Sequence, residues 1–185
     1  LASYDLSACV TMKLTRIRLL GLMAASLASL AAQAGEITVS AAASLTNAFR
    51  DIAPLFEAAH PGAKVQLNFA ASGALLAQIA KGAPADVFVS ADQESMDQAQ
   101  QQNLLKAGQR RDVVSNALVV IVPAPAPRLP ATLADLNQPA FARIAIGQPA
   151  SVPVGRYAKS VLEAAKLWTP IEAKMIGASS VRQVL

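Results

Sequence analysis

The amino-acid sequence predicts an α/β fold of two domains, each built on a doubly wound parallel sheet. Runs of β-branched residues alternate along the chain with segments whose apolar residues recur at helical spacing. Strands and helices that alternate in this way form parallel sheets with helices on both faces. The composition, 54% hydrophobic and 15% charged, is typical of a packed globular protein. We expect a first domain over residues 35–116 and an incomplete second domain over residues 117–185.

The first domain is expected to begin with a strand and an amphipathic helix. The β-branched run at residues 37–39 predicts the strand, and apolar residues on one face between 45 and 59 predict the helix. Pro54 lies inside that helix and removes a backbone hydrogen bond, so we expect a kink or a division there. Alternation of apolar and polar residues at 65–69 predicts the second strand.

A second strand–helix unit follows directly. Ser72 precedes an expected helix over residues 74–81, because the glycine and proline that come next are stop signals. The apolar run at residues 87–89 predicts a third strand. Asp92 is then expected to cap a helix that runs towards Leu105.

The second domain is expected to begin with a buried strand over residues 117–122, because that run is continuously apolar. The proline-rich stretch at 123–130 predicts a stiff surface loop that completes the crossover between domains. Beyond it we expect a short helix at 133–136, a strand at 144–147 and a helix at 157–167.

The last residues, 179–185, are typical of the start of another helix with a serine hydroxyl at its N-cap. No helix stop signal follows them. We therefore expect a sequence truncated at its C-terminus, whose missing segment completes the second domain and returns to the first.

The N-terminal segment has the pattern of a secretory signal peptide. Basic residues in 12–18 precede a short apolar stretch at 19–30, and Ala-Gln-Ala follows, so we expect cleavage after Ala34 and export to the periplasm. A membrane anchor is the alternative, but it needs about 20 apolar residues. Residues 1–11 are interpreted as an upstream extension. They hold Cys9, the sole cysteine, so the exported chain has no disulfide or thiolate chemistry.

The charge distribution argues against a nucleic-acid partner. The formal net charge is +4, and removing residues 1–34, with three basic groups and one acidic group, leaves about +2. No run of Lys and Arg with interleaved aromatic residues remains, so the pattern of a nucleic-acid interface is missing from the sequence.

Two serines stand where a predicted strand ends and a helix begins. At Ser44 and Ser72 the first N–H groups of a helix are free and its dipole is positive, which favours an anion. Simple helix capping by serine is the alternative. Residues 40–46 and 70–76 contain no Asp or Glu that could accept a proton from a protonated oxyanion. A dianion fits better, and sulfate, molybdate and tungstate all remain open.

Five segments of the chain form a pattern typical of one family: AAASLTNA at 41–48, FAASG at 69–73, GAPADVFVSAD at 82–92, VPVGRYAK at 152–159 and SVR at 180–182. Together they resemble the periplasmic molybdate-binding proteins of ABC transporters. The resemblance covers nearly all of residues 35–185 and implies the two-domain type II periplasmic binding protein fold, with the domains joined by a hinge.

The resemblance also implies the ligand set and the partners. Hydroxyl and N–H groups of Ser44 and Ser72, with backbone N–H groups of Val154 and Val181, would hold the oxyanion, and a tyrosine hydroxyl would follow beyond Leu185. The ligand would be molybdate and tungstate, with molybdenum bound only as its oxyanion and no cofactor or directly coordinated metal. A monomer would deliver it to an inner-membrane permease with its ATPase.

Two departures from the family pattern affect the expected pocket. Many relatives have alanine where this chain has Val154, and a hydroxyl residue where it has Gly73. Since a backbone donor tolerates the first change, both departures bear on pocket size and leave the choice between molybdate and tungstate open.

Two other functions remain as alternatives. One is a sulfate or thiosulfate receptor, and the other is an enzyme on a similar scaffold. An enzyme needs a general base or a nucleophile, and the sequence has no Ser-His pair in these motifs. His60 is interpreted as a surface turn residue. The remaining candidates are assigned to turns and caps (Asp86 and Asp92) or to packing (Tyr157 and Trp168).

Overall fold

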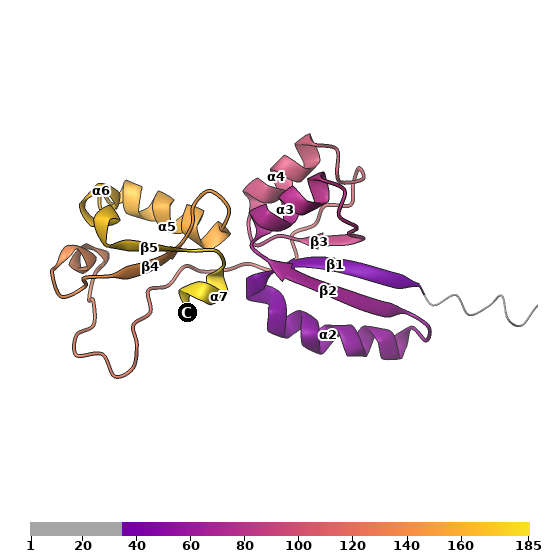
Figure 1. Ribbon diagram of the computed structural model, residues 1–185, viewed down its shortest axis with the longest axis horizontal. Coiled ribbons are helices and arrows are strands. Elements are labelled where there is room, and N and C mark those ends of the chain that lie inside the picture. The colour runs from indigo at the N-terminus through magenta and orange to yellow at the C-terminus, as the bar shows by residue number, and fades with distance from the viewer. Residues whose placement is uncertain (1–34) are drawn as a thin grey trace, which may run out of the picture.

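The structure, a computed structural model, describes residues 35–185, which form two α/β units that lie side by side (Figure 1). The N-terminal unit has a parallel sheet of three strands in the order β2-β1-β3. The strands are β1 (Glu36–Ala42), β2 (Lys64–Ala70) and β3 (Val87–Val89), and the helices are α2 (Thr46–Ala59), α3 (Ser72–Ala80) and α4 (Gln93–Gln101).

Helices cover both faces of this sheet, as doubly wound topology requires. The chain moves from β1 to its neighbour β2 through α2, and then back across β1 to β3 through α3. Right-handed connections that run in opposite directions place their helices on opposite faces. Figure 1 shows α2 on one face, and α3 with α4 on the other.

The C-terminal unit has two parallel strands and a small core of its own. Its sheet pairs β4 (Ile144–Gly147) with β5 (Met175–Ala178). Leu136, Leu162 and Ile171 are buried together, and Trp168 packs against them as expected. The helices are η3 (Leu133–Asn137), α5 (Pro153–Ala164), α6 (Trp168–Ile171), η4 (Glu172–Lys174) and α7 (Val181–Val184).

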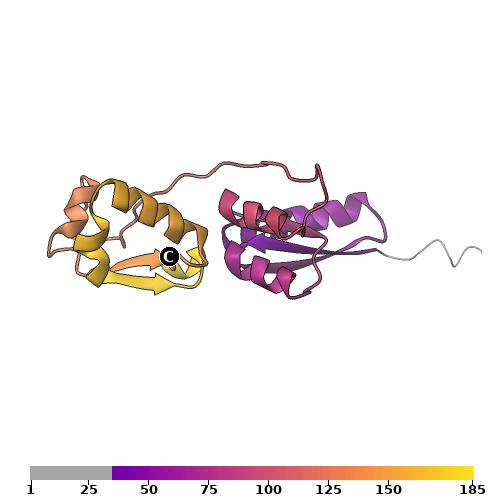
Figure 2. The same ribbon diagram turned by 90° about the horizontal axis from the view of Figure 1, so that it is seen from above.

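The buried strand expected at residues 117–122 is wrong. The chain there forms an extended connection between the units with no helix or strand assigned (Figure 2), and Val119 is 71% exposed. An apolar run has strand character only when an adjacent strand accepts its backbone hydrogen bonds. Within residues 35–185 no strand pairs with this segment.

The strand β5 and the short helix α6 were not predicted, and the other differences from expectation concern helix boundaries. α2 continues through Pro54 and is not divided, and the proline lies on its exposed side. α3 begins at Ser72 and α5 at Pro153, both earlier than expected. Proline at the first position of α5 is favourable because the N–H it lacks has no partner inside the helix.

None of the helices within residues 35–185 combines the length and the apolar character needed to span a membrane. The signal peptide, its cleavage after Ala34 and the extension at residues 1–11 lie outside the described residues.

Candidate functional site

The carboxyl ends of both sheets point towards the junction between the two units (Figure 2). In open α/β sheets ligands bind beyond the carboxyl ends of the strands. All four predicted ligand residues follow a strand at this edge. Ser44 lies in η2 (Ala43–Leu45) after β1, Ser72 begins α3 after β2, Val154 lies in the first turn of α5 after β4, and Val181 begins α7 after β5.

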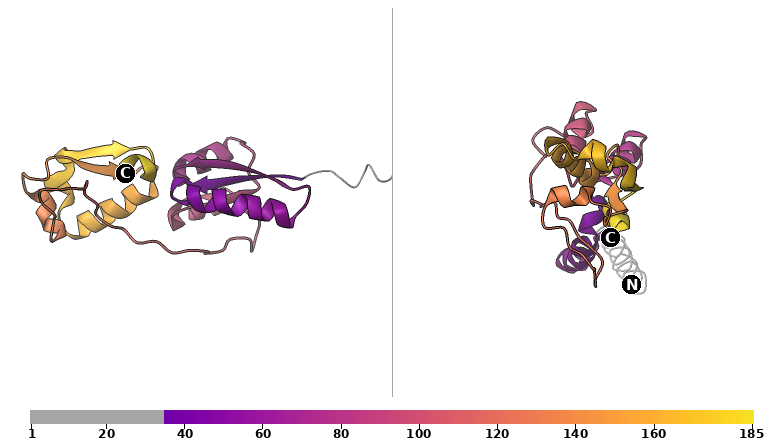
Figure 3. Two further views of the ribbon diagram at one scale, coloured as in Figure 1. Left: turned by 90° about the horizontal axis from the view of Figure 1, so that it is seen from below. Right: turned by 90° about the vertical axis from the view of Figure 1, so that its left-hand side faces the viewer.

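Hydrogen bonds join the two units at this junction. The Gly73 N–H of α3 donates to the Ser151 carbonyl oxygen at 3.2 Å, which places the start of α3 beside the loop before α5. Arg182 of α7 donates through Nε to the Ala43 carbonyl oxygen at 3.0 Å, and through Nη2 to Asn47 Oδ1 at 2.6 Å. The structure therefore brings the four predicted residues to one junction, with α7 located between the units (Figure 3).

Neither predicted serine is a helix N-cap, so the capping interpretation is wrong for both. The N-cap of α3 is Ala71, and those of η2 and α2 are Ala42 and Leu45, none with a side-chain cap. Ser72 is fully buried, and its Oγ accepts a hydrogen bond from the Ala91 N–H at 3.0 Å. Because that bond uses Oγ as an acceptor, the hydroxyl proton is available for an anion. Ser44 is exposed.

The two backbone N–H groups predicted to bind the anion make no hydrogen bond within the described residues. Among the hydrogen bonds of residues 35–185, none is donated by the N–H of Val154 or Val181. The first N–H groups of a helix have no partner inside it and carry its positive partial charge. Ser180 caps α7 by accepting from the Gln183 N–H at 3.3 Å, which confirms the hydroxyl cap expected there.

Two glycines set the position of the α5 N-terminus. A Cβ added to Gly155 would lie 2.0 Å from the Gly147 carbonyl oxygen, and one added to Gly147 would lie 2.8 Å from Val152 Cγ1. A residue with a Cβ fits at neither position, because Gly155 lies against the backbone of Gly147 and Gly147 lies against the side chain of Val152. The first turn of α5, with the Val154 N–H, is therefore held against the end of β4.

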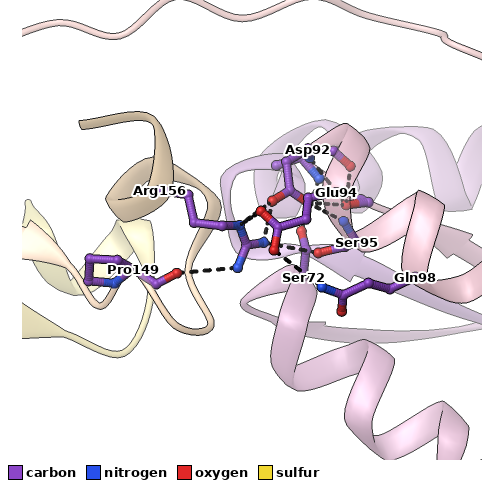
Figure 4. A network of polar contacts seen from close by, with 9 residues as sticks. Ser72, Asp92, Glu94, Ser95, Gln98, Pro149 and Arg156 are labelled. Carbon is purple, nitrogen blue, oxygen red and sulfur yellow. Dashed lines mark hydrogen bonds and ion pairs between the residues drawn. The ribbon is translucent and has the colours of Figure 1, made fainter. Parts of the chain in front are cut away.

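An ion pair between the units was not predicted from the sequence. Asp92 caps α4, as expected, by accepting from the Ser95 N–H at 3.2 Å, and it also binds Arg156 of α5 (Figure 4). Burial raises the pKa of Asp92, but hydrogen bonds from Arg156, Ser95 and Ser90 outweigh it and hold the pKa below its usual value.

One signal in the sequence could have indicated a partner for Arg156. A cation in the first turns of a helix faces the positive end of the helix dipole, which is unfavourable unless a carboxylate lies nearby.

Tyr157, which was expected to pack in the core, is 43% exposed. Its pKa is raised by partial burial, and the negative charge of Asp92 adds to that rise.

The remaining candidates have structural roles. His60 ends α2, where Nδ1 lies 3.0 Å from the Phe56 carbonyl oxygen and the two rings stack. Asp86 accepts the Thr38 N–H at 2.8 Å and ties its turn to β1. Within the described part of the chain, no three His, Cys, Asp or Glu side chains form a group that could hold a metal ion.

Replacing Gly73 by alanine is expected to weaken ligand binding without destabilising α3. A Cβ at this position would lie 2.8 Å from the Ser151 carbonyl oxygen of the other unit, so the units must move apart. Alanine in a helix otherwise stabilises it by about 0.5–1 kcal/mol relative to glycine. We expect an unchanged or higher Tm and an affinity lower by about tenfold in calorimetric titration.

Gly35→Ala is the control for this variant, because its added methyl group meets no atom within 4 Å. Equal affinity of Gly73→Ala and the unmodified protein would show that close contact between Gly73 and Ser151 has no role in binding.

Comparison with known proteins places the chain in a family. The family described as bacterial extracellular solute-binding protein matches residues 37–185. The Escherichia coli K12 molybdate-binding protein ModA is 40% identical over 158 residues, which are 83% of this chain and 61% of that protein. ModA of Haemophilus influenzae is 34% identical over 176 residues, 94% of this chain and 69% of that protein.

A solved structure agrees with this result. The substrate-binding domain of a putative molybdenum ABC transporter from Clostridium difficile has a TM-score of 0.57 and 36% identity, and the match covers 80% of this chain and 64% of that one. The chain spans about three-fifths of the length of its E. coli relative, 61%. The fold and these matches together show that the chain belongs to the bacterial extracellular solute-binding protein family.

Proposed function

We propose that this protein captures molybdate, and also tungstate, outside the cytoplasmic membrane and delivers the oxyanion to an ABC importer. The observation that carries the proposal is the convergence of four strand-to-helix loops at the junction of the units, two of which contain the predicted ligand serines, Ser44 and Ser72. The names of the relatives, molybdate-binding protein ModA, support the choice of ligand.

Neutral donors can supply the affinity that capture requires. A hydrogen bond to a charged group contributes about 1.5–3 kcal/mol, so donors at the four loops contribute roughly 6–12 kcal/mol before the cost of association. A helix N-terminus adds only about 0.3–1 kcal/mol. Binding therefore depends chiefly on the two hydroxyls and the backbone N–H groups at Ser44, Ser72, Val154 and Val181.

The acid–base character of the junction favours a fully ionised ligand. The loops at 40–46 and 70–76 contain no carboxylate that could accept a proton from hydrogen phosphate. Asp92 is close to the Ser72 loop, but its carboxylate already accepts from Arg156, Ser90 and Ser95. Molybdate, tungstate and sulfate are dianions at neutral pH and need no such acceptor.

Transport follows from closure of the two units around the anion. A ligand that binds one conformation better shifts the protein towards it by the difference in affinity. We propose that a hinge in the connection between the units allows this closure, and that the closed monomer docks on an inner-membrane permease whose ATPase drives import. The protein acts as a receptor without a cofactor and catalyses no reaction.

Titration calorimetry with molybdate, tungstate, sulfate and phosphate tests the proposal. We expect tight binding of molybdate and tungstate, much weaker binding of sulfate and no heat with phosphate. A preference for sulfate would replace the proposal by the sulfate receptor. If none of the four anions binds, capture of tetrahedral oxyanions is wrong for this protein.

A further inference from the structure

A single arginine makes the most extensive polar contact between the two units (Figure 4). Arg156 Nε lies 2.8 Å from Asp92 Oδ2 and 3.2 Å from Glu94 Oε2, and Nη2 binds Asp92 as well. Nη2 also donates to Ser95 Oγ at 3.1 Å, and Nη1 to the Pro149 carbonyl oxygen at 3.4 Å. One side chain of α5 thus joins the N-terminus of α4 to the loop after β4.

Burial separates this ion pair from the others in the described residues. The side chains of Arg156 and Asp92 are 15% and 2% exposed, whereas those of Arg110 and Asp97 are 26% and 56% exposed. An exposed pair contributes little to stability, while loss of one partner from a buried pair leaves an uncompensated charge. Loss of Arg156 or Asp92 is therefore expected to weaken the contact between the units more than loss of an exposed ion pair would.

The acceptor for Arg156 is fixed within the N-terminal unit before the units meet. Asp92 Oδ1 accepts from the Ser90 hydroxyl at 3.0 Å and from the Ser95 N–H at 3.2 Å. These bonds orient the carboxylate, and together with the larger contribution of Arg156 they hold its pKa below the usual value despite burial. Closure then needs to order only the arginine side chain.

In each unit, the Arg156–Asp92 contact lies close to a group that is proposed to donate a hydrogen bond to the anion. The residue before Asp92 is Ala91, whose N–H donates to Ser72 Oγ at 3.0 Å. Arg156 follows Val154 by two residues in the first turns of α5. When Arg156 reaches Asp92, the Ser72 hydroxyl and the Val154 N–H are brought to the same junction.

We propose that the Arg156–Asp92 contact is a latch between the units that stabilises their closed arrangement and thereby sets the affinity and residence time of the captured oxyanion. The inference rests on the proposed function. Arg156 and Asp92 are positioning residues that do not touch the ligand, because the N–H groups of Arg156 donate to acceptors of the protein itself. Apparent affinity falls in proportion as the binding-competent conformation becomes less populated.

In a competing explanation, the positive charge of Arg156 attracts the anion directly. The two explanations predict opposite changes in anion affinity for one variant. Asp92→Asn keeps an N-cap acceptor for the Ser95 N–H and removes one negative charge. An attractor freed from its carboxylate would bind the dianion more tightly. A latch that has lost its acceptor binds it more weakly.

The experiment compares Arg156→Met, Asp92→Asn and the double variant with Arg110→Met, the control that breaks an ion pair inside the N-terminal unit. Titration with molybdate is expected to show about tenfold weaker binding for each of the first two. The double variant is expected to be no weaker than either single variant, because both remove the same contact. Arg110→Met is expected to bind as the unmodified protein does.

Small-angle scattering without ligand tests the latch separately from the ligand assignment. We expect a larger radius of gyration for Arg156→Met and Asp92→Asn than for the unmodified protein. If the unmodified protein binds no oxyanion, the proposed function fails and this measurement still decides the latch. Tighter binding by Asp92→Asn, additive losses in the double variant, or unchanged radii in both single variants would overturn the latch.

Discussion

Replacing Ser44 and Ser72 together by alanine is expected to lower the affinity for molybdate by at least about a hundredfold. In the proposed site each serine hydroxyl would donate to the charged oxyanion. Such a bond contributes about 1.5–3 kcal/mol, and 1.4 kcal/mol corresponds to a tenfold change in affinity. Calorimetric titration of the double variant, beside each single variant, measures this loss. A double variant that binds as tightly as the unmodified protein would show that the anion lies elsewhere.

The two serines differ in what their replacement does to the fold, which the experiment has to separate from binding. Ser44 is exposed, so its alanine variant is expected to melt as the unmodified protein does. Ser72 is fully buried, and its removal leaves the Ala91 N–H without its acceptor, at a cost of about 1–3 kcal/mol in stability. Ser160→Ala, at an exposed site in α5, is the control that changes neither quantity.

Local patterns were enough to predict most strands. The expected strands at 87–89 and 144–147 have the bounds observed for β3 and β4, because short apolar runs between turn residues define them. Sequence pattern alone does not show whether a partner strand is present. Residues 117–122 have strand composition but no pairing strand within residues 35–185.

In the candidate site too, residues within local motifs could be predicted from the sequence, whereas a contact between distant residues could not. Ser44, Ser72, Val154 and Val181 were predicted because each follows a strand or belongs to a family motif, and the structure brings them to one junction. Their role as ligands stays a prediction. The Arg156–Asp92 contact was not predicted because 64 residues separate its partners, and Asp92 already had a sufficient local role as an N-cap.

Substitution of Gly155 by alanine is expected to cause the largest loss of stability among the variants considered. Its Cβ would lie 2.0 Å from the Gly147 carbonyl oxygen and 2.5 Å from that carbonyl carbon, and both are backbone atoms that cannot rotate away. Overpacking of a core typically costs about 1–3 kcal/mol, and a clash with backbone belongs at or above that range. The higher helix propensity of alanine, about 1 kcal/mol, does not offset it.

The clash also has a direct consequence for binding, because relief requires α5 to move away from the end of β4. That movement displaces the Val154 N–H and Arg156 together, so we expect both a lower Tm and weaker molybdate binding by the molecules that remain folded. Ser160→Ala installs the same residue in the same helix and is expected to change neither. If Gly155→Ala melts and binds as the control does, the close approach of α5 to β4 does not position the anion donors.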